Sequence, residues 1–134
     1  MRLLLDTHCW LWMESAPERF TPAVRELLTD PETELLLSAA SCWEIAIKHS
    51  LGKLALPQPP EQYVLSRMER NAVSALPVTP AHALRVAVLP LHHRDPFDRL
   101  LVAQATVEGL PLLSVDRELA PYEVEILWAA GEGP

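Results

Sequence analysis

The chain has 134 residues, of which 49% are hydrophobic, and a formal net charge of −7 from 11 basic and 18 acidic side chains. A chain of this size buries enough surface to hold one domain, residues 1–134, without disulfide staples. The acidic balance argues against a protein that coats nucleic acid through a basic face. It does not exclude a protein whose acids gather metal ions and so handle phosphates.

The two cysteines and the N-terminus indicate the compartment. Cys9 and Cys42 lie in apolar helical patterns without metal or redox spacing, which predicts small buried side chains in a reducing environment. Asp6 interrupts the first apolar run, so we expect no signal peptide. No window approaches the roughly 20 apolar residues of a membrane span. We therefore expect a soluble, cytoplasmic protein without a membrane partner.

The first predicted strand, residues 2–5, is an unalternated apolar run of the kind that is buried on both faces of a parallel sheet. It ends at Asp6 and Thr7, just before a helical pattern, and a second helix opens at residues 21–22. Ligands bind at the carboxyl ends of strands in open parallel sheets. Asp6 is therefore a site candidate, with an ordinary helix N-cap as the alternative.

A second buried strand over residues 34–38 leads into a helix predicted from residue 39 to 51, which Gly52 ends. Most of this helix is apolar, and Trp43 belongs to that apolar surface. Ser41, Glu44 and Lys48 form one narrow polar stripe. The stripe is either a surface ion pair or the wall of a cleft, and its narrowness favours the cleft.

A proline-rich connector over residues 53–60, a helix over 61–72, a strand over 74–78 and a helix capped at 79–80 carry no recognisable chemistry. The stretch from His92 to Arg99 is richer in charge. There Asp95 is a good N-cap, Pro96 suits the first helical position, and Asp98 falls where an acid can bond back to the cap. Asp98 also shares a face with packed aliphatic side chains, so it needs a metal ion or an arginine as a partner.

Gly109 ends that helix, and residues 110–116 form another buried strand that ends in an acid, Asp116. A last strand over residues 124–128 fits an edge position. Alternating short strands and helices predict an α/β fold, with a short, mostly parallel sheet between two helical layers.

Four acids are thus expected at one place: Asp6 and Asp116 from strand ends, Glu44 from the polar stripe, and Asp98 from a helix start. They form a hard-oxygen ligand set for Mg²⁺ or Mn²⁺, with no competing zinc spacing of cysteines and histidines. The hydroxyls of Thr7 and Ser114 are candidates to support these ligands. Residues His92 and His93, being adjacent, are interpreted as flanking.

The chain resembles the PIN-domain ribonucleases, and among them the VapC-type toxins of bacterial toxin–antitoxin pairs. The blocks that carry the resemblance are Leu4-Leu5-Asp6-Thr7-His8, residues 41–48 with Gly52-Lys53-Leu54, residues 93–105, and Leu113-Ser114-Val115-Asp116. The resemblance implies an α/β/α fold, acidic active-site positions at Asp6, Glu44, Asp98 and Asp116, Mg²⁺ or Mn²⁺ dependence, and endonucleolytic hydrolysis of RNA by metal-activated water. It also implies homodimers and an antitoxin that blocks the site. One departure is Ser114, where relatives usually carry threonine.

The candidates for holding the RNA backbone are Lys48, Arg94, Arg99 and Arg117. A haloacid-dehalogenase-type phosphatase is an alternative, but it normally needs Asp-x-Asp where this chain has Asp6-Thr7-His8. The other alternative is a silent binding module, which would lack at least one of the four acids. No motif names the RNA that is cut. The connector, the helix from residue 61 and the acidic pocket together predict a groove for an amphipathic antitoxin segment, with a basic antitoxin side chain among the four acids.

Overall fold

The computed structural model describes residues 1–131 of the chain. Its elements, in chain order, are β1 (Arg2–Leu5), α1 (Thr7–Ser15), the 3₁₀ turn η1 (Pro17–Arg19), α2 (Pro22–Thr29), β2 (Glu34–Ser38), α3 (Ala39–Ser50), α4 (Pro60–Arg70), β3 (Val73–Leu76), α5 (Pro80–Arg85), η2 (Val86–Val88), α6 (Pro96–Glu108), β4 (Leu112–Ser114), η3 (Arg117–Leu119) and β5 (Ile126–Trp128). The predicted strands and helices are present, with ends shifted by a few residues.

The five strands form one sheet in the order β3-β2-β1-β4-β5. Every neighbouring pair is parallel, and β1 in the centre pairs Leu4 with Leu36 of β2 and with Leu112 of β4. The last strand lies at the edge, as its sequence predicts. Because all strands run the same way, their carboxyl ends meet at one edge of the sheet, which is where a ligand site is expected.

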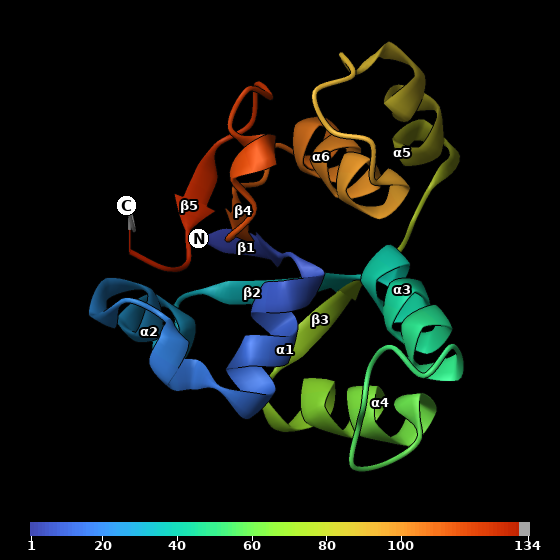
Figure 1. Cartoon of the computed structure of the whole chain (residues 1–134). Coiled ribbons are helices and arrows are strands. Elements are labelled where there is room, and N and C mark those ends of the chain that lie inside the picture. The colour runs from blue at the N-terminus through green and yellow to red at the C-terminus, as the bar shows by residue number, and fades with distance from the viewer. Residues whose placement is uncertain (132–134) are drawn as a thin grey trace.

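Helices cover both faces of the sheet (Figure 1). Leu3 and Leu5 point to the face that α1, α2, α3 and α4 cover, where they pack with Trp10 and Ile45. Leu4, between them, points to the opposite face and packs under α6 with its neighbours in that cluster. Successive side chains of a strand alternate between faces, so the apolar run of β1 supplies both cores. The predicted α/β/α layering is confirmed.

The helix starts that matter for the site have sequence-encoded caps. Asp95 caps α6 by accepting hydrogen bonds from the backbone N–H groups of Phe97 and Asp98, and Pro96 occupies the first helical position. Gly109 ends α6 in the left-handed region, with φ of 64°. These signals fix where α6 begins, and hence where Asp98 stands relative to the sheet.

Trp43 belongs to the apolar surface of α3, yet its side chain is 62% exposed. It packs edge-on against Phe97 of α6, with ring centroids 5.4 Å apart. The polar stripe faces inward, since Ser41 and Glu44 are both buried. The prediction that this stripe lines a cleft is therefore confirmed for Glu44 and Lys48, which line a hollow beside α1 and α6.

Within residues 1–131, no helix combines the length and the apolar character needed to cross a membrane. Both cysteines are free; Cys9 is buried in the core, and Cys42 is half-buried. Burial raises the pKa of the Cys9 thiol, with a smaller contribution from the charge of Asp6. Cys9 therefore acts as a small apolar side chain, as its sequence context predicts.

Candidate acidic active site at the carboxyl edge of the sheet

The structure brings the four predicted acids together. Asp6 follows β1, Asp116 follows β4, Glu44 projects from α3, and Asp98 lies in the first turn of α6. They line one hollow of about 180 Å³, whose full lining is Asp6, Thr7, His8, Glu44, Lys48, His93, Asp95, Asp98 and Asp116. Parallel strand order explains why residues more than 100 positions apart in sequence meet here.

Asp6 is 3% exposed and combines the two roles that its sequence position left open. Its Oδ1 caps α1 by accepting from the backbone N–H of Cys9 at 2.7 Å. Its Oδ2 accepts a 2.5 Å hydrogen bond from the hydroxyl of Ser114 at the end of β4. Burial raises the pKa of Asp6, and these two hydrogen bonds oppose that rise by stabilising the carboxylate.

Glu44 is 5% exposed and is held by two partners. The hydroxyl of Thr7 donates to Oε1 at 2.6 Å and also lies 2.9 Å from the hydroxyl of Ser41. Lys48 Nζ donates to Oε2 at 2.5 Å, one helical turn further along α3. The hydrogen bond to Glu44 is the largest cause of a raised pKa of Lys48. The polar stripe therefore forms one wall of the hollow and does not face open water.

His93 is the residue that the sequence interpretation misplaced. Its Nε2 lies 2.8 Å from Asp116 Oδ2 and 2.9 Å from Asp98 Oδ2, and its Nδ1 lies 3.0 Å from Glu118 Oε2. His93 is thus central to the site, whereas His92 stacks edge-on against Tyr122. Burial lowers the pKa of His93, but the hydrogen bond to Asp116 and the three nearby carboxylates outweigh burial and raise it.

Asp95 is a fifth carboxylate of the hollow, in addition to its capping role. Both capping hydrogen bonds, at 2.9 Å and 3.1 Å, go to its Oδ1. The reciprocal bond from Asp98 back to the cap, which a capping box would need, is replaced by the contact between Asp98 and His93. The sequence therefore predicts the cap correctly but not the place of Asp95 in the lining of the hollow.

The carboxylates of the hollow repel one another. Burial is the largest cause that raises the pKa of Asp98, to about 7, and the charges of Asp95, Asp6 and Glu44 raise it further, while His93 lowers it. The hollow sets five carboxylates against only Lys48, His93 and His8. Carboxylate oxygens are the preferred ligands of Mg²⁺ and Mn²⁺, and one atom each from His93, Asp98 and Asp116 lie within 4.8 Å of one another. The donor set therefore fits a divalent cation.

The three arginines that were proposed to hold RNA differ in their surroundings. Arg99 directs its guanidinium to main-chain carbonyls, among them those of Pro90 and Val86, and to the hydroxyl of Tyr122. Arg117 stacks over the ring of Trp128, 4.1 Å from its centroid. Arg94 is exposed. The Arg99 side chain thus braces the loop before α6 from within.

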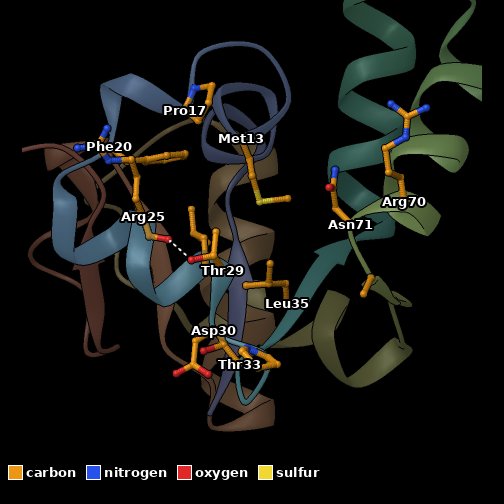
Figure 2. A pocket seen from close by; sticks show the side chains of 13 residues that line it. Met13, Pro17, Phe20, Arg25, Thr29, Asp30, Thr33, Leu35, Arg70 and Asn71 are labelled. Carbon is orange, nitrogen blue, oxygen red and sulfur yellow. Dashed lines mark hydrogen bonds between the residues drawn. The ribbon is translucent and has the colours of Figure 1, made fainter.

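A larger hollow, of about 650 Å³, lies elsewhere (Figure 2). It is formed by α1, α2, the start of β2 and the end of α4, at the amino end of the strands. Met13 and Leu35 contribute apolar surface, Arg25 and Arg70 contribute positive charge, and Asp30 is its one lining carboxylate. None of the four predicted acids reaches it, so size does not identify the candidate site here.

The sequence matches the PIN domain family model over residues 3–124. The chain belongs to the PIN-domain family. The prediction made from its four sequence blocks is confirmed.

Two curated relatives are VapC ribonucleases of Mycobacterium tuberculosis. Ribonuclease VapC22 is 32% identical over 123 residues, which cover 90% of this chain and 91% of the relative. Ribonuclease VapC16 is 50% identical over 58 residues, which cover 43% of this chain and 41% of the relative. The latter match therefore spans less than half of that protein. The similarity to VapC-type PIN-domain proteins agrees with the sequence prediction.

A solved structure supports the fold. The crystal structure of VapBC2 from Rickettsia felis bound to a DNA fragment from their promoter contains a chain that superposes with a TM-score of 0.70, covering 95% of this chain and 98% of that one. The two share only 12% sequence identity. The arrangement of the sheet and helices is therefore retained where most side chains differ.

Proposed function

We propose that this PIN-domain chain is a divalent-metal-dependent endoribonuclease and the toxin of a toxin–antitoxin pair. The observation that carries the proposal is the convergence of Asp6, Glu44, Asp98 and Asp116, from four separate elements, on one hollow at the carboxyl edge of the sheet. The similarity to VapC ribonucleases supports RNA as the class of substrate. The whole chain, residues 1–134, serves as one nuclease domain in the cytoplasm.

The four acids would hold Mg²⁺ or Mn²⁺. When bound, such a cation activates the attacking water and neutralises charge that develops on the phosphoryl group. Ser114 fixes Asp6, and Thr7 fixes Glu44, so the ligand oxygens are oriented before metal arrives. His93 holds Asp98 and Asp116 side by side through its Nε2. These neighbours pre-organise the carboxylates.

The RNA backbone would meet fewer cations than the sequence suggests. Lys48 lines the acidic hollow, and the exposed Arg94 lies in sequence between His93 and Asp95, which also line it. Both therefore remain in the proposal, together with Arg117, which follows Asp116. The guanidinium of Arg99 is occupied by main-chain carbonyls, and we assign it to holding the loop before α6.

The proposed protein partner is a cognate antitoxin whose basic side chain competes for the acidic hollow while an amphipathic segment lies near the connector over residues 53–60 and α4. Co-expression with the antitoxin should give a stable complex that cleaves RNA more slowly than the free chain. Equal rates for complex and free chain would overturn this mode of inhibition.

We further propose that the free chain is a homodimer. Leu84, Val88 and Leu91, around α5 and η2, are all more than 70% exposed, and such apolar surface is expected to be covered by a second subunit. Light scattering of the purified chain should give twice the monomer mass, and Leu84→Glu should shift it to the monomer mass.

The test of the nuclease proposal is incubation of the free chain with transfer and ribosomal RNA in Mg²⁺ or Mn²⁺. Cleavage should stop in EDTA and in the Asp98→Asn variant, and should continue in Arg25→Ala, a change on the far side of the molecule. Cleavage that persists in EDTA at the wild-type rate, or in Asp98→Asn, would overturn the proposal. Hydrolysis of a phosphomonoester with RNA left intact would instead identify a phosphatase.

A further inference from the structure

A second, smaller hollow adjoins the acidic one. It measures about 140 Å³, and its full lining is Thr7, His8, Leu11, Glu44, Ile45, Lys48, Lys53 and Leu54. Thr7, His8, Glu44 and Lys48 also line the acidic hollow, so the two share a wall. The two hollows are therefore neighbours, and we name the second one the Lys53 hollow.

Acidic side chains outnumber basic ones in the lining of the acidic hollow, and basic side chains outnumber acidic ones in the lining of the Lys53 hollow. The acidic hollow has five carboxylates in its lining, whereas the Lys53 hollow has only Glu44. Glu44 is already paired with Lys48, which leaves Lys53 and His8 as the basic groups without an acid of the same hollow to oppose them. Across residues 1–131, no carboxylate lies within ion-pair distance of the Lys53 ammonium.

The backbone that carries Lys53 is fixed at the end of α3. Gly52 adopts φ of 72°, its N–H donates to His49 O at 3.0 Å, and the N–H of Lys53 donates to Lys48 O at 2.9 Å. These two bonds are the Schellman arrangement of a helix end. Leu54, the next residue, packs against the core of the sheet face that α1 covers. Lys53 is therefore an exposed side chain on a rigid main chain.

We propose that the Lys53 hollow is a phosphate subsite, which receives the RNA phosphodiester next to the one placed at the four acids. This inference rests on the proposed ribonuclease function. Consecutive phosphates along a single strand need separate cationic partners, and the acidic hollow would supply one only through metal. The subsite holds a phosphate and not a base, because it is small and its lining has no phenylalanine, tyrosine or tryptophan ring on which a base could stack.

The experiment measures steady-state cleavage of a short single-stranded RNA, with Mg²⁺, by the full chain. Lys53→Ala should raise KM about tenfold at low salt and leave kcat near the wild-type value, because one charge-assisted hydrogen bond to phosphate is lost. Lys53→Arg should restore most of the affinity. The slope of log KM against log salt should become shallower by about 0.7, as for one lost phosphate contact on a single strand. Arg25, an exposed cation on the hollow of about 650 Å³, supplies the matched control: Arg25→Ala should change neither KM nor the salt slope.

Neutral methylphosphonate linkages locate the contact. Replacing the phosphate on one side of the cleaved bond should raise KM for the wild type but add nothing for Lys53→Ala. The proposal is overturned if the penalty is the same in both proteins, or if Lys53→Ala matches Arg25→Ala. It is also overturned if Lys53→Ala weakens only the complex with the antitoxin, which would assign the hollow to an acidic peptide. Absence of any RNA cleavage by the wild type would overturn the nuclease proposal itself, and the subsite with it.

Discussion

Ser114 Oγ donates a 2.5 Å hydrogen bond to Asp6 Oδ2, which joins the carboxyl ends of β4 and β1 across 108 positions of sequence. Ser114 Oγ also accepts a hydrogen bond from the backbone N–H of Asp116 at 3.1 Å. One hydroxyl therefore orients two of the four acids. A threonine at this position would keep that hydroxyl.

Ser114→Ala should destabilise the protein by about 1–3 kcal/mol, because it leaves a buried carboxylate oxygen without its donor. The pKa of Asp6 should rise further, since the Ser114 hydrogen bond is the largest cause that lowers it. Chemical denaturation measures the stability, and Ser114→Thr is the control that retains the hydroxyl. Equal stability and cleavage for Ser114→Ala and the wild type would show that the bond does not organise the site.

Metal-free stability should depend on pH through Asp98. Its folded-state pKa is raised to about 7, chiefly by burial, whereas the ordinary value is 3.8. Because the pKa of Asp98 is higher in the folded state than in the unfolded state, the folded state binds more protons at pH values between these two pKa values. The free energy of unfolding therefore falls as pH rises from about 4 to about 7. Asp98→Asn removes this loss.

Thermal melts in EDTA between pH 4 and pH 8 measure this effect. The Tm of Asp98→Asn minus that of the wild type should grow with pH across the window and level off above it. A difference that stays constant or shrinks with pH would show that Asp98 ionises normally in the folded state.

Asp95 and Asp98 should respond differently to substitution. Asp95→Ala removes both capping bonds of α6 and should cost about 0.5–2 kcal/mol with or without metal, whereas Asp95→Asn keeps a good cap and should cost far less. The wild type and both Asp95 variants should gain roughly 2.7 kcal/mol at a hundredfold excess of Mg²⁺ over its dissociation constant. Asp98→Asn should gain much less. If Mg²⁺ stabilises Asp98→Asn as much as the wild type but does not stabilise Asp95→Asn, then Asp95 and not Asp98 is the metal ligand.

The end of α3 offers a test of backbone conformation. Gly52→Ala should lower the free energy of unfolding by about 1–2 kcal/mol, because φ of 72° is strained for alanine. Steric overlap does not contribute, since a Cβ atom at residue 52 would meet no atom within 4 Å. Gly109→Ala, at φ of 64° and equally open, is the matched control for stability. Only Gly52→Ala should also raise KM for RNA, since it moves Lys53. If both variants leave KM unchanged, the turn at Gly52 does not position the lysine.

Sequence reasoning predicts the parallel sheet and the meeting of Asp6, Glu44, Asp98 and Asp116, because strand ends, helix periodicity and caps are local signals that parallel topology then combines. Its failures concern contacts that no local signal encodes. The role of His93 depends on the irregular turn before α6, and no spacing rule places its ring between Asp98 and Asp116.

Trp43 and Arg99 show how packing places residues that a local pattern leaves open. The narrow polar stripe of α3 turns inward as its sequence predicts, but no pattern within the helix shows that the ring of Trp43 is left exposed. Arg99 looks like an exposed cation in sequence, yet the loop over residues 85–93 folds around its guanidinium and offers main-chain carbonyls. Long-range packing decides both positions.

The most direct measurement is the chemistry of the RNA ends that the purified chain produces in Mg²⁺. If the four carboxylates hold a cation that activates water, each cut should leave a 5′-phosphate and a 3′-hydroxyl, and Asp98→Asn should make no such ends. Fragments that carry 2′,3′-cyclic phosphate, formed at the same rate by Asp98→Asn and in EDTA, would contradict the proposed active site.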